Sequence, residues 1–254
     1  MSNWTALLLA GSRPGRDPFA EAHGTDLKAL IPLAGRPLVA YPAAALLASP
    51  EVDRVRVLAQ QPQRIAAALP KDKRLTVEPS GATIAATMEA ILADPATRFP
   101  LLVTTADHAL LTPAMIADFC AQAAGADLAI GVVERRALEA RLPGTRRTWI
   151  GFRGGAYSGA NLFAFGSARA APAVALWRLV EQDRKTGWRL LGALGVPGLL
   201  GLARLRTLDQ TLAAIGRRLC VTLAKIELAD PLAAVDIDKP ADHALAEAIL
   251  AGRA

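Results

Sequence analysis

The chain has 254 residues, of which 52% are hydrophobic and 20% charged, and its formal net charge is +6. This composition excludes a disordered or fibrous chain and predicts one well-packed α/β domain over residues 1–254. The positive charge favours ligands that carry phosphate. Aromatic residues make up only 5% and no basic stretch is interleaved with them, which argues against nucleic-acid binding by base stacking.

Cysteine usage and apolar runs bear on the compartment. Cys120 and Cys220 have no CxxC motif or neighbouring histidine pair, so neither a disulfide framework nor a zinc site is expected, and the cytoplasm is the simplest location. The apolar N-terminal run is too short for a signal peptide or a membrane span. The uncharged stretch 190–203 contains glycines and Pro197, which favours a buried or lid helix, with weak contact at a membrane interface as the alternative. The sequence does not indicate an oligomeric state.

Short apolar runs alternate along the chain with segments of helical period, which predicts βαβ units and a largely parallel sheet. The expected strands are residues 5–10, 55–59, 75–78, 101–105, 128–133, 161–165 and 219–226. The expected helices are residues 38–48, 62–68, 84–93, 113–123, 173–183, 208–217 and 241–250. Because ligands of open α/β sheets gather at the carboxyl ends of the strands, we expect the functional residues in the loops that follow strands.

The first expected strand leads into a glycine-bearing turn, LAGSR, and the basic residues Arg16 and Lys28 follow it. Backbone N–H groups in such a turn approach phosphate oxygens closely, while Arg and Lys neutralise the charge that develops when a phosphoryl bond breaks. The turn therefore predicts a polyphosphate site. The bland alternative is an ordinary glycine turn with a solvent-facing lysine. The residues expected to contact a nucleotide here are Leu9, Ala10, Gly11, Ser12 and Arg13.

A dinucleotide fingerprint is a poor description of the same turn. It needs the spacing GxGxxG directly before a helix, and Gly11 and Gly15 do not provide it. Pro14 and Pro18 also oppose an immediate helix.

The expected strand 101–105 delivers an aspartate, Asp107, to its carboxyl end. Mg²⁺ prefers carboxylate oxygens together with substrate phosphates and water, so this side chain can anchor a magnesium ion on a nucleotide. The alternative role is a cap for the helix that is expected to begin near Pro113.

The first loop resembles the signature of the nucleotidyltransferases that activate sugar phosphates and related head-groups, LAGG-x-GTR followed by K-x-L-x-P-L-x-G-x-P-L. Ser12 replaces the second glycine of that signature, and the signature arginine is Arg13 or Arg16. Matching residues stand at Gly11, Arg16, Lys28, Pro32, Gly35, Pro37 and Leu38. The stretch AAVDIDKPAD near the C-terminus resembles the D-I-D-T-P-E-D segment of the same family.

The resemblance implies a Rossmann-like three-layer α/β/α fold with a mostly parallel sheet, of the nucleotide-diphospho-sugar transferase type, with a lid and acceptor-binding subregion at about 137–201. It implies that Lys28 and Arg16 are catalytic and that Asp107 and Asp238 bind Mg²⁺. The alternative for Asp238 is an N-cap of the last helix. Asp236 ranks lower as a metal ligand, on the expectation that side chains at a strand end alternate between faces.

Two further parts of the site follow from the resemblance. Ser80, Gly81 and Thr83 correspond to the turn that reads the nucleobase, although an ordinary strand-to-helix turn describes them equally well. Gly159 and Asn161 correspond to the acceptor-binding strand. Lys185 is expected to hold the acceptor phosphate, with a solvated basic patch as the alternative.

The function implied by the resemblance is a Mg²⁺-dependent transfer of NMP from an NTP, with CTP or GTP favoured, to a small phosphorylated acceptor with release of pyrophosphate. The acceptor classes left open are phosphorylated polyols, sugar 1-phosphates, amino-alcohol or other head-group phosphates, and a molybdopterin-type cofactor. One alternative is a glycosyltransferase that consumes a nucleotide sugar. The other is an inactive nucleotide-binding regulatory module, suggested by Ser12 in place of glycine and by the lack of an acid beside Asp107.

Overall fold

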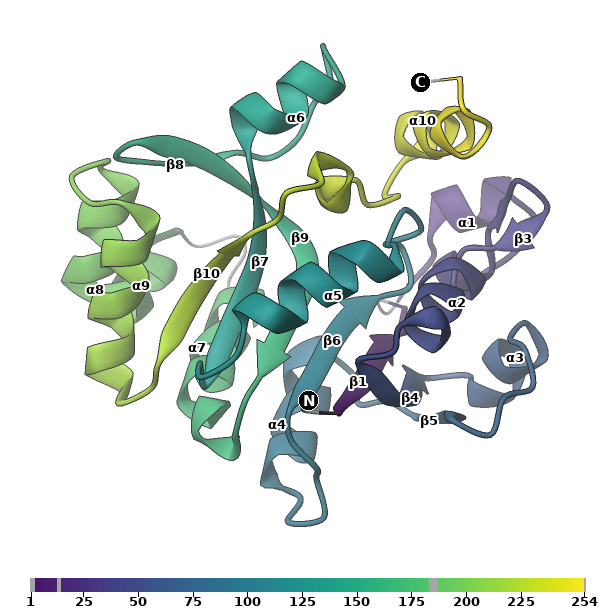
Figure 1. Ribbon diagram of the computed structural model, residues 1–254, viewed down its shortest axis with the longest axis horizontal. Coiled ribbons are helices and arrows are strands. Elements are labelled where there is room, and N and C mark those ends of the chain that lie inside the picture. The colour runs from purple at the N-terminus through teal and green to yellow at the C-terminus, as the bar shows by residue number, and fades with distance from the viewer. Residues whose placement is uncertain (1–2, 13–14, 183–186, 254) are drawn as a thin grey trace.

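A computed structural model describes residues 3–12, 15–182 and 187–253 of the chain (Figure 1). Among these residues, one sheet has the strand order β10-β7-β9-β6-β1-β4-β5, with β8 paired to β9, and β2 and β3 form a separate hairpin. The strands are β1 (Trp4–Leu9), β2 (Pro32–Leu33), β3 (Arg36–Pro37), β4 (Val52–Ala59), β5 (Leu75–Pro79), β6 (Leu101–Thr105), β7 (Leu128–Glu134), β8 (Ile150–Phe152), β9 (Gly155–Phe165) and β10 (Leu223–Glu227).

The sheet is mostly parallel, as predicted. β1 pairs in parallel with β4 and β6, β4 pairs with β5, and β7 pairs with β10. β9 is the exception, because it runs antiparallel to both β6 and β7 and lies between them. The carboxyl ends of β1, β4, β5 and β6 consequently lie along one edge of the sheet, next to the beginning of β9.

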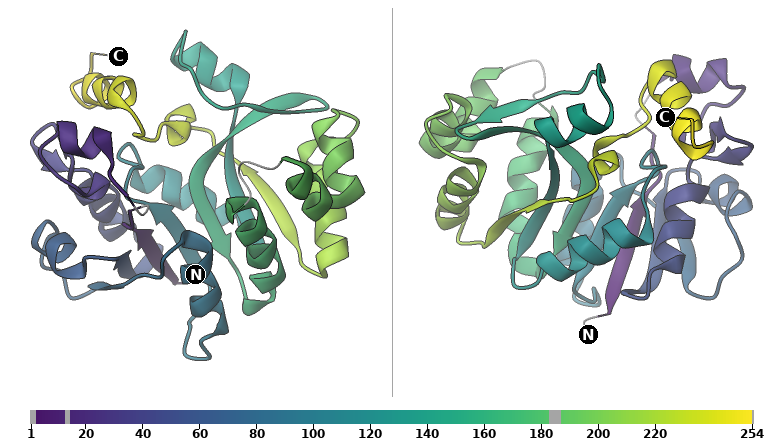
Figure 2. Two further views of the ribbon diagram at one scale, coloured as in Figure 1. Left: turned by 180° about the vertical axis from the view of Figure 1, so that it is seen from behind. Right: turned by 45° about the horizontal axis from the view of Figure 1, so that its top comes forward.

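Helices cover both faces of the sheet, which confirms the three-layer prediction (Figures 1 and 2). On one face α2 (Ala40–Ala48) and α5 (Pro113–Gln122) pack over Leu8 and Val57 of the central strands. On the other face α4 (Ile84–Ala93) and α7 (Ala171–Gln182) pack over Leu7 and Leu58. All four side chains are buried. The central strands are therefore apolar on both sides, as in other covered parallel sheets.

Two predicted strands differ from the observed ones by four residues or more at their starts. The prediction of strand 219–226 was wrong at its start, because α9 (Leu208–Leu219) continues to Leu219 and ends at Cys220 in the left-handed region (φ 57°). The apolar residues around position 219 fit a helix end and a strand start equally well by periodicity alone. The expected strand 161–165 is the second half of β9, whose first half, GAYSGA, consists mostly of small residues and has no strand-like pattern.

Two short helices, α1 (Pro18–Ala22) and α6 (Arg135–Arg141), were not predicted. Each has few apolar residues and α1 begins with proline, which weakens the periodic signal. The remaining helices agree with the prediction in large part: α3 (Pro62–Ala67), α8 (Gly187–Leu202) and α10 (Pro240–Leu250).

The segment 137–201, which was predicted to contribute a lid, contains elements of different kinds. β9 and α7 belong to the sheet and to its helical cover, while α6 and β8 lie beyond the carboxyl edge (Figure 1). The stretch 190–203 is helical over most of its length, as expected, with a kink at Gly195 (φ 63°). Within the described residues, no helix combines the length and apolar character needed to span a membrane.

The two cysteines provide a check on the packing. Cys120 is 5% exposed, and burial raises the pKa of its thiol to about 12, whereas Cys220 is exposed. Because the thiolate is the reactive form, we expect a thiol reagent to modify one cysteine per chain in the native protein and two after unfolding in denaturant. Equal reaction rates of both thiols in the native protein would contradict this packing.

Candidate active site

Backbone hydrogen bonds continue beyond the strand ends and hold the loops of the carboxyl edge next to one another. The Ala10 N–H bonds to the carbonyl of Leu58 at 2.9 Å, the Ser80 N–H to that of Ala59 at 3.0 Å, and the Ala106 N–H to that of Leu9 at 3.0 Å. The turn after β1, the residue after β4, the turn after β5 and the loop after β6 therefore lie side by side. This is the edge at which a ligand of an open α/β sheet is expected.

Lys28 lies at the centre of this edge and contacts two carboxylates. Its Nζ is 2.5 Å from Oδ2 of Asp107 and also donates to Oδ1 of Asp238. The lysine and Asp107 are about one fifth exposed, whereas the Asp238 side chain is 60% exposed. Burial alone lowers the pKa of Lys28, but the charges of Asp107 and Asp238 outweigh it and hold this pKa above its ordinary value.

A backbone contact explains why two acids so distant in the sequence meet. The Ile237 N–H donates to the carbonyl of Asp107 at 3.1 Å, and the Ile237 side chain is fully buried. The alternative role of the two acids, as caps of the helices that follow them, is wrong. Thr112 caps α5 by accepting from the Met115 N–H, and the N-cap position of α10 is Lys239. Asp107 and Asp238 are thus directed at Lys28 and not at helix ends.

Asp236 lies close to the same acids but contacts Arg147 and not Lys28. The expected alternation of faces does not separate Asp236 from Asp238, because residues two apart on a strand share a face. Burial, together with repulsion by Asp238 and Asp107, raises the pKa of Asp236 to about 6, against the opposing charges of Arg147 and Lys28. The Arg147 guanidinium, only 7% exposed, contacts the Asp236 carboxylate and its backbone carbonyl.

Gln60, which directly follows β4, is a residue that the sequence analysis missed. Its Oε1 accepts from the Ser12 N–H at 2.7 Å, and its Nε2 donates to the Gly81 carbonyl at 3.3 Å. A Cβ at Gly11 would lie 2.9 Å from Nε2 of Gln60, so a larger residue at position 11 would displace the Gln60 side chain. Gln60 therefore joins the two turns predicted to bind the nucleotide. Its place at a strand end was the available signal.

The side chains of these two turns have distinct surroundings. Among the described residues, the buried hydroxyls of Ser12 and Ser80 have no hydrogen-bond partner. Thr83 uses its hydroxyl to cap α4 by accepting from the Ala86 N–H. This turn therefore does act as an ordinary strand-to-helix turn with a capping threonine. Contacts of the turn with a nucleobase stay a prediction.

The structure does not bring every predicted residue to Lys28. Arg16 is 84% exposed and pairs with Glu21, while Arg13 and Lys185 fall outside the described residues. Leu9, Ala10 and Gly11 lead into the loop at the carboxyl edge. Gly159 and Asn161 lie in β9, and the Asn161 amide donates to Asp236 at 3.4 Å.

The donor set fits a hard cation that shares its coordination with a substrate. The two carboxylate oxygens that contact Lys28 lie within about 5 Å of each other, and Mg²⁺ holds oxygen ligands at about 2.1 Å. Among the described residues no three His, Cys, Asp or Glu side chains form a metal-binding group on their own. Magnesium at nucleotide sites is usually bound through one or two carboxylates plus phosphates and water.

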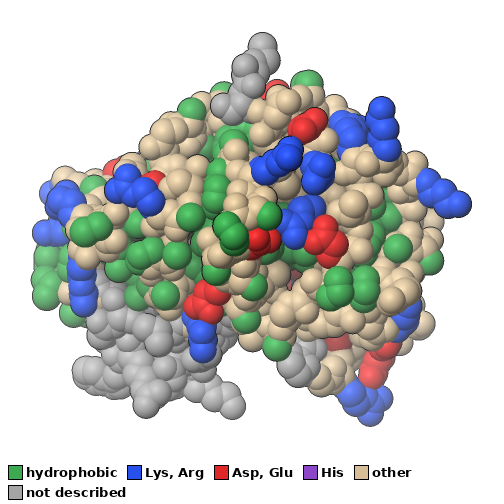
Figure 3. Space-filling model, turned by 90° about the horizontal axis from the view of Figure 1, so that it is seen from below, with side chains coloured by type: hydrophobic (Ala, Val, Ile, Leu, Met, Phe, Trp, Pro, Cys, Tyr) green, Lys and Arg blue, Asp and Glu red, His purple; other side chains and the backbone are tan. Residues whose placement is uncertain are grey.

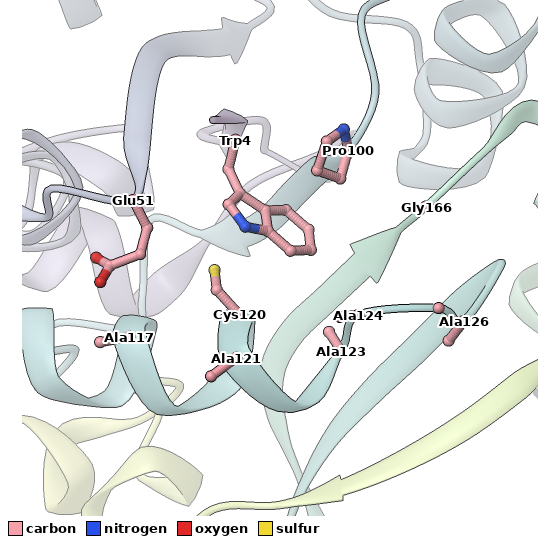
Figure 4. Close-up of a pocket in the computed structure, with 11 residues that line it drawn as sticks. Trp4, Glu51, Pro100, Ala117, Cys120, Ala121, Ala123, Ala124, Ala126 and Gly166 are labelled. Carbon is pink, nitrogen blue, oxygen red and sulfur yellow. The ribbon is translucent and has the colours of Figure 1, made fainter. Parts of the chain in front are cut away.

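A hollow of about 470 Å³ lies at the opposite, amino edge of the sheet, beneath Trp4 and Pro100 (Figure 4). Its charged lining residue is Glu51, and most of the other lining residues are small and apolar. It therefore does not suit a polyphosphate. Seen from below, Lys and Arg side chains lie at several separate places on the surface, and Asp and Glu side chains lie beside some of them (Figure 3).

Comparison with known proteins places this site in a family. Residues 6–247 match the MobA-like NTP transferase domain. No curated protein matches the sequence. Among solved structures, a hypothetical transferase from Thermus thermophilus is 28% identical, with 95% of this chain and 99% of that chain covered and a TM-score of 0.78.

Two more distant structures share the fold. The 4-diphosphocytidyl-2C-methyl-D-erythritol synthase from Anaerococcus prevotii is 10% identical, with 98% of this chain and 96% of that chain covered and a TM-score of 0.59. A CMP:2-keto-3-deoxy-manno-octonic acid synthetase complexed with CTP is 12% identical, with 99% and 100% covered and a TM-score of 0.60. With the family match spanning nearly the whole sequence, the chain belongs to the MobA-like NTP transferase domains and is a nucleotidyltransferase.

Proposed function

We propose that the chain transfers NMP from an NTP, with CTP or GTP favoured, to the phosphate of a small acceptor with the help of Mg²⁺, and that pyrophosphate leaves. The observation that supports this most directly is the contact of Lys28 with both Asp107 and Asp238 at the carboxyl edge of the sheet. In the resembling nucleotidyltransferases, the corresponding lysine acts on the phosphates and the corresponding acids hold the metal.

The reaction needs little covalent work from the protein. An acceptor phosphate oxygen forms a bond to the α-phosphorus of the NTP, and the bond from that phosphorus to the pyrophosphate oxygen breaks. The protein contributes positioning and charge neutralisation. Lys28 would neutralise oxygens of the α-phosphate and the leaving pyrophosphate.

Asp107 and Asp238 would hold the magnesium ion, which when bound neutralises phosphate charge and orients the triphosphate. Asp107 is fixed for this role, because its carboxylate also accepts from the Thr105 hydroxyl. Asp238 is more exposed and lies on the open side of the cluster.

The turns at Gly11–Ser12 and Ser80–Gly81 would bind the nucleotide, and Gln60 holds them together. We expect Gln60→Ala to raise the KM for the NTP by about fivefold while kcat changes less than about threefold, because the nucleotide must then order both turns. Steady-state kinetics with a varied NTP measure this. Gln63→Ala, an exposed change in the neighbouring helix, is the matched control. An unchanged KM in Gln60→Ala would remove this residue from the nucleotide site.

A substrate matrix tests the proposal as a whole. Four NTPs are combined with phosphorylated polyols, sugar 1-phosphates, amino-alcohol phosphates and a molybdopterin-type cofactor, and pyrophosphate release is measured with Mg²⁺ and with EDTA. CTP is the first choice, because distant relatives of the fold are named for cytidyl transfer or bind CTP. The long first loop resembles the sugar and head-group enzymes more than the molybdopterin ones.

The two alternatives predict different results. The family match argues against a glycosyltransferase, which would consume a nucleotide sugar without forming pyrophosphate. An inactive module would bind Mg-NTP and release pyrophosphate with none of the acceptors. Pyrophosphate release that depends on both an acceptor and Mg²⁺ supports the proposal, and its absence across the matrix contradicts it.

A further inference from the structure

Arg147 is a buried cation that the proposed mechanism does not use. It lies in the loop between α6 and β8, and its guanidinium reaches the segment 236–242 on the far side of the carboxyl edge. Its Nη1 bonds to the Asp236 carboxylate and, at 3.2 Å, to the Asp236 carbonyl. Its Nη2 lies 3.4 Å from Oδ1 of Asp242.

The same contacts fix the position of Asp238. The second carboxylate oxygen of Asp242 accepts from the Asp238 N–H at 3.2 Å, and Asp242 is 5% exposed. Asn161 holds the other oxygen of Asp236 at 3.4 Å. The short segment that carries Asp238 is therefore held by Arg147 from one side and by the backbone of Asp107 from the other.

The charges of this cluster are unequal. Four carboxylates lie together, those of Asp107, Asp236, Asp238 and Asp242, against the cations Lys28 and Arg147. One divalent cation would balance this excess of two negative charges. The Arg147 Nε and Nη2 atoms are closed off from solvent, so a substrate does not reach them in this conformation. Any effect of Arg147 on the reaction must therefore pass through the acids.

We propose that Arg147 is a positioning residue for the transfer reaction: it neutralises Asp236 and fixes the segment 236–238, so that two carboxylates and not three face the divalent cation and the triphosphate. The inference rests on the proposed function. Without Arg147, the third carboxylate attracts the cation more strongly and repels the anionic substrates.

Mn²⁺ titrated into the nucleotide-free protein by calorimetry tests the cluster without any turnover. We expect Arg147→Met to lower the Kd for Mn²⁺ by at least about fivefold, although the same variant has a KM for NTP raised at least about tenfold. Arg147→Lys keeps the charge and should leave the Mn²⁺ affinity within about twofold of wild type. Arg146→Met, an exposed change in the same loop, is the matched control with unchanged affinity.

The acid partner gives an independent arm. Asp236→Asn should weaken Mn²⁺ binding by about fivefold, and the double variant Arg147→Met with Asp236→Asn should return to within about twofold of wild type, because the charge balance is restored. If Arg147→Met alone fails to fold, Mn²⁺ binding can still be measured in the double variant, because it leaves no unpaired buried carboxylate at position 236. The restored affinity is a result that a merely structural role does not produce.

Three outcomes overturn the inference: Arg147→Met binds Mn²⁺ no more tightly than wild type, the double variant does not recover, or the wild-type protein binds no Mn²⁺. Failure of the proposed function is distinguishable, because it shows as absent pyrophosphate release in the wild-type matrix, whatever the variants bind.

Discussion

Asp107→Asn is expected to lower kcat by at least about a hundredfold with little change in the free energy of unfolding. The carboxylate contacts Lys28 and sits at the end of a buried strand, so its charge is directed into the site and not used to cap a helix. Asparagine keeps the shape and one acceptor oxygen for the Thr105 hydroxyl. The measurement is pyrophosphate release at saturating substrates, together with a denaturant titration.

Asp53→Asn is the matched control, because this aspartate is exposed on β4 and away from the carboxyl edge. It should keep wild-type turnover. The Asp107 variant should also bind Mn²⁺ more weakly than wild type, since one ligand is lost. Near-normal turnover in Asp107→Asn would refute the metal-binding role of this residue.

Lys28→Met has the second large expected effect, a loss of about a thousandfold in kcat/KM. The change removes the cation that neutralises phosphate charge, and it leaves Asp107 and Asp238 facing each other without their shared partner. Mn²⁺ binding should respond in the opposite direction to Asp107→Asn and become tighter, because two carboxylates lose a competing cation.

The opposite responses separate the two roles. Lys71 is exposed and lies more than forty positions after Lys28, so Lys71→Met controls for the loss of a positive charge. If Lys28→Met weakens Mn²⁺ binding as Asp107→Asn does, the lysine is needed to build the site and not to act on the phosphates.

The parts of the fold that the sequence predicts are those with a continuous physical signal. The strand 101–105 agrees with β6 residue for residue, because the short run LLVTT combines apolar residues with β-branched ones and directly follows Pro100. The rule that ligands gather at carboxyl ends directed attention to Asp107, and the resemblance of the C-terminal segment added Asp238. Lys28 does meet both acids in the structure.

The parts that the sequence did not predict depend on contacts between distant loops. Arg147 lies 89 positions before Asp236 and has no periodic or motif signal around it. Gln60 looks like an ordinary loop residue until the turns on either side of it are placed. Arg16 was expected at the phosphates from its place in the motif. In the structure its guanidinium donates to the carboxylate of Glu21, five positions later.

The position of β9 has a consequence for how this protein is made. The strand fills the space between β6 and β7, so the first three parallel strands and β6 are complete on a ribosome well before Phe165 has been synthesised. Until then β6 offers a free row of peptide groups to any other extended segment. Nascent chains that stop before residue 165 should consequently aggregate more readily than slightly longer ones, because sheet closure waits for a late, reversed strand.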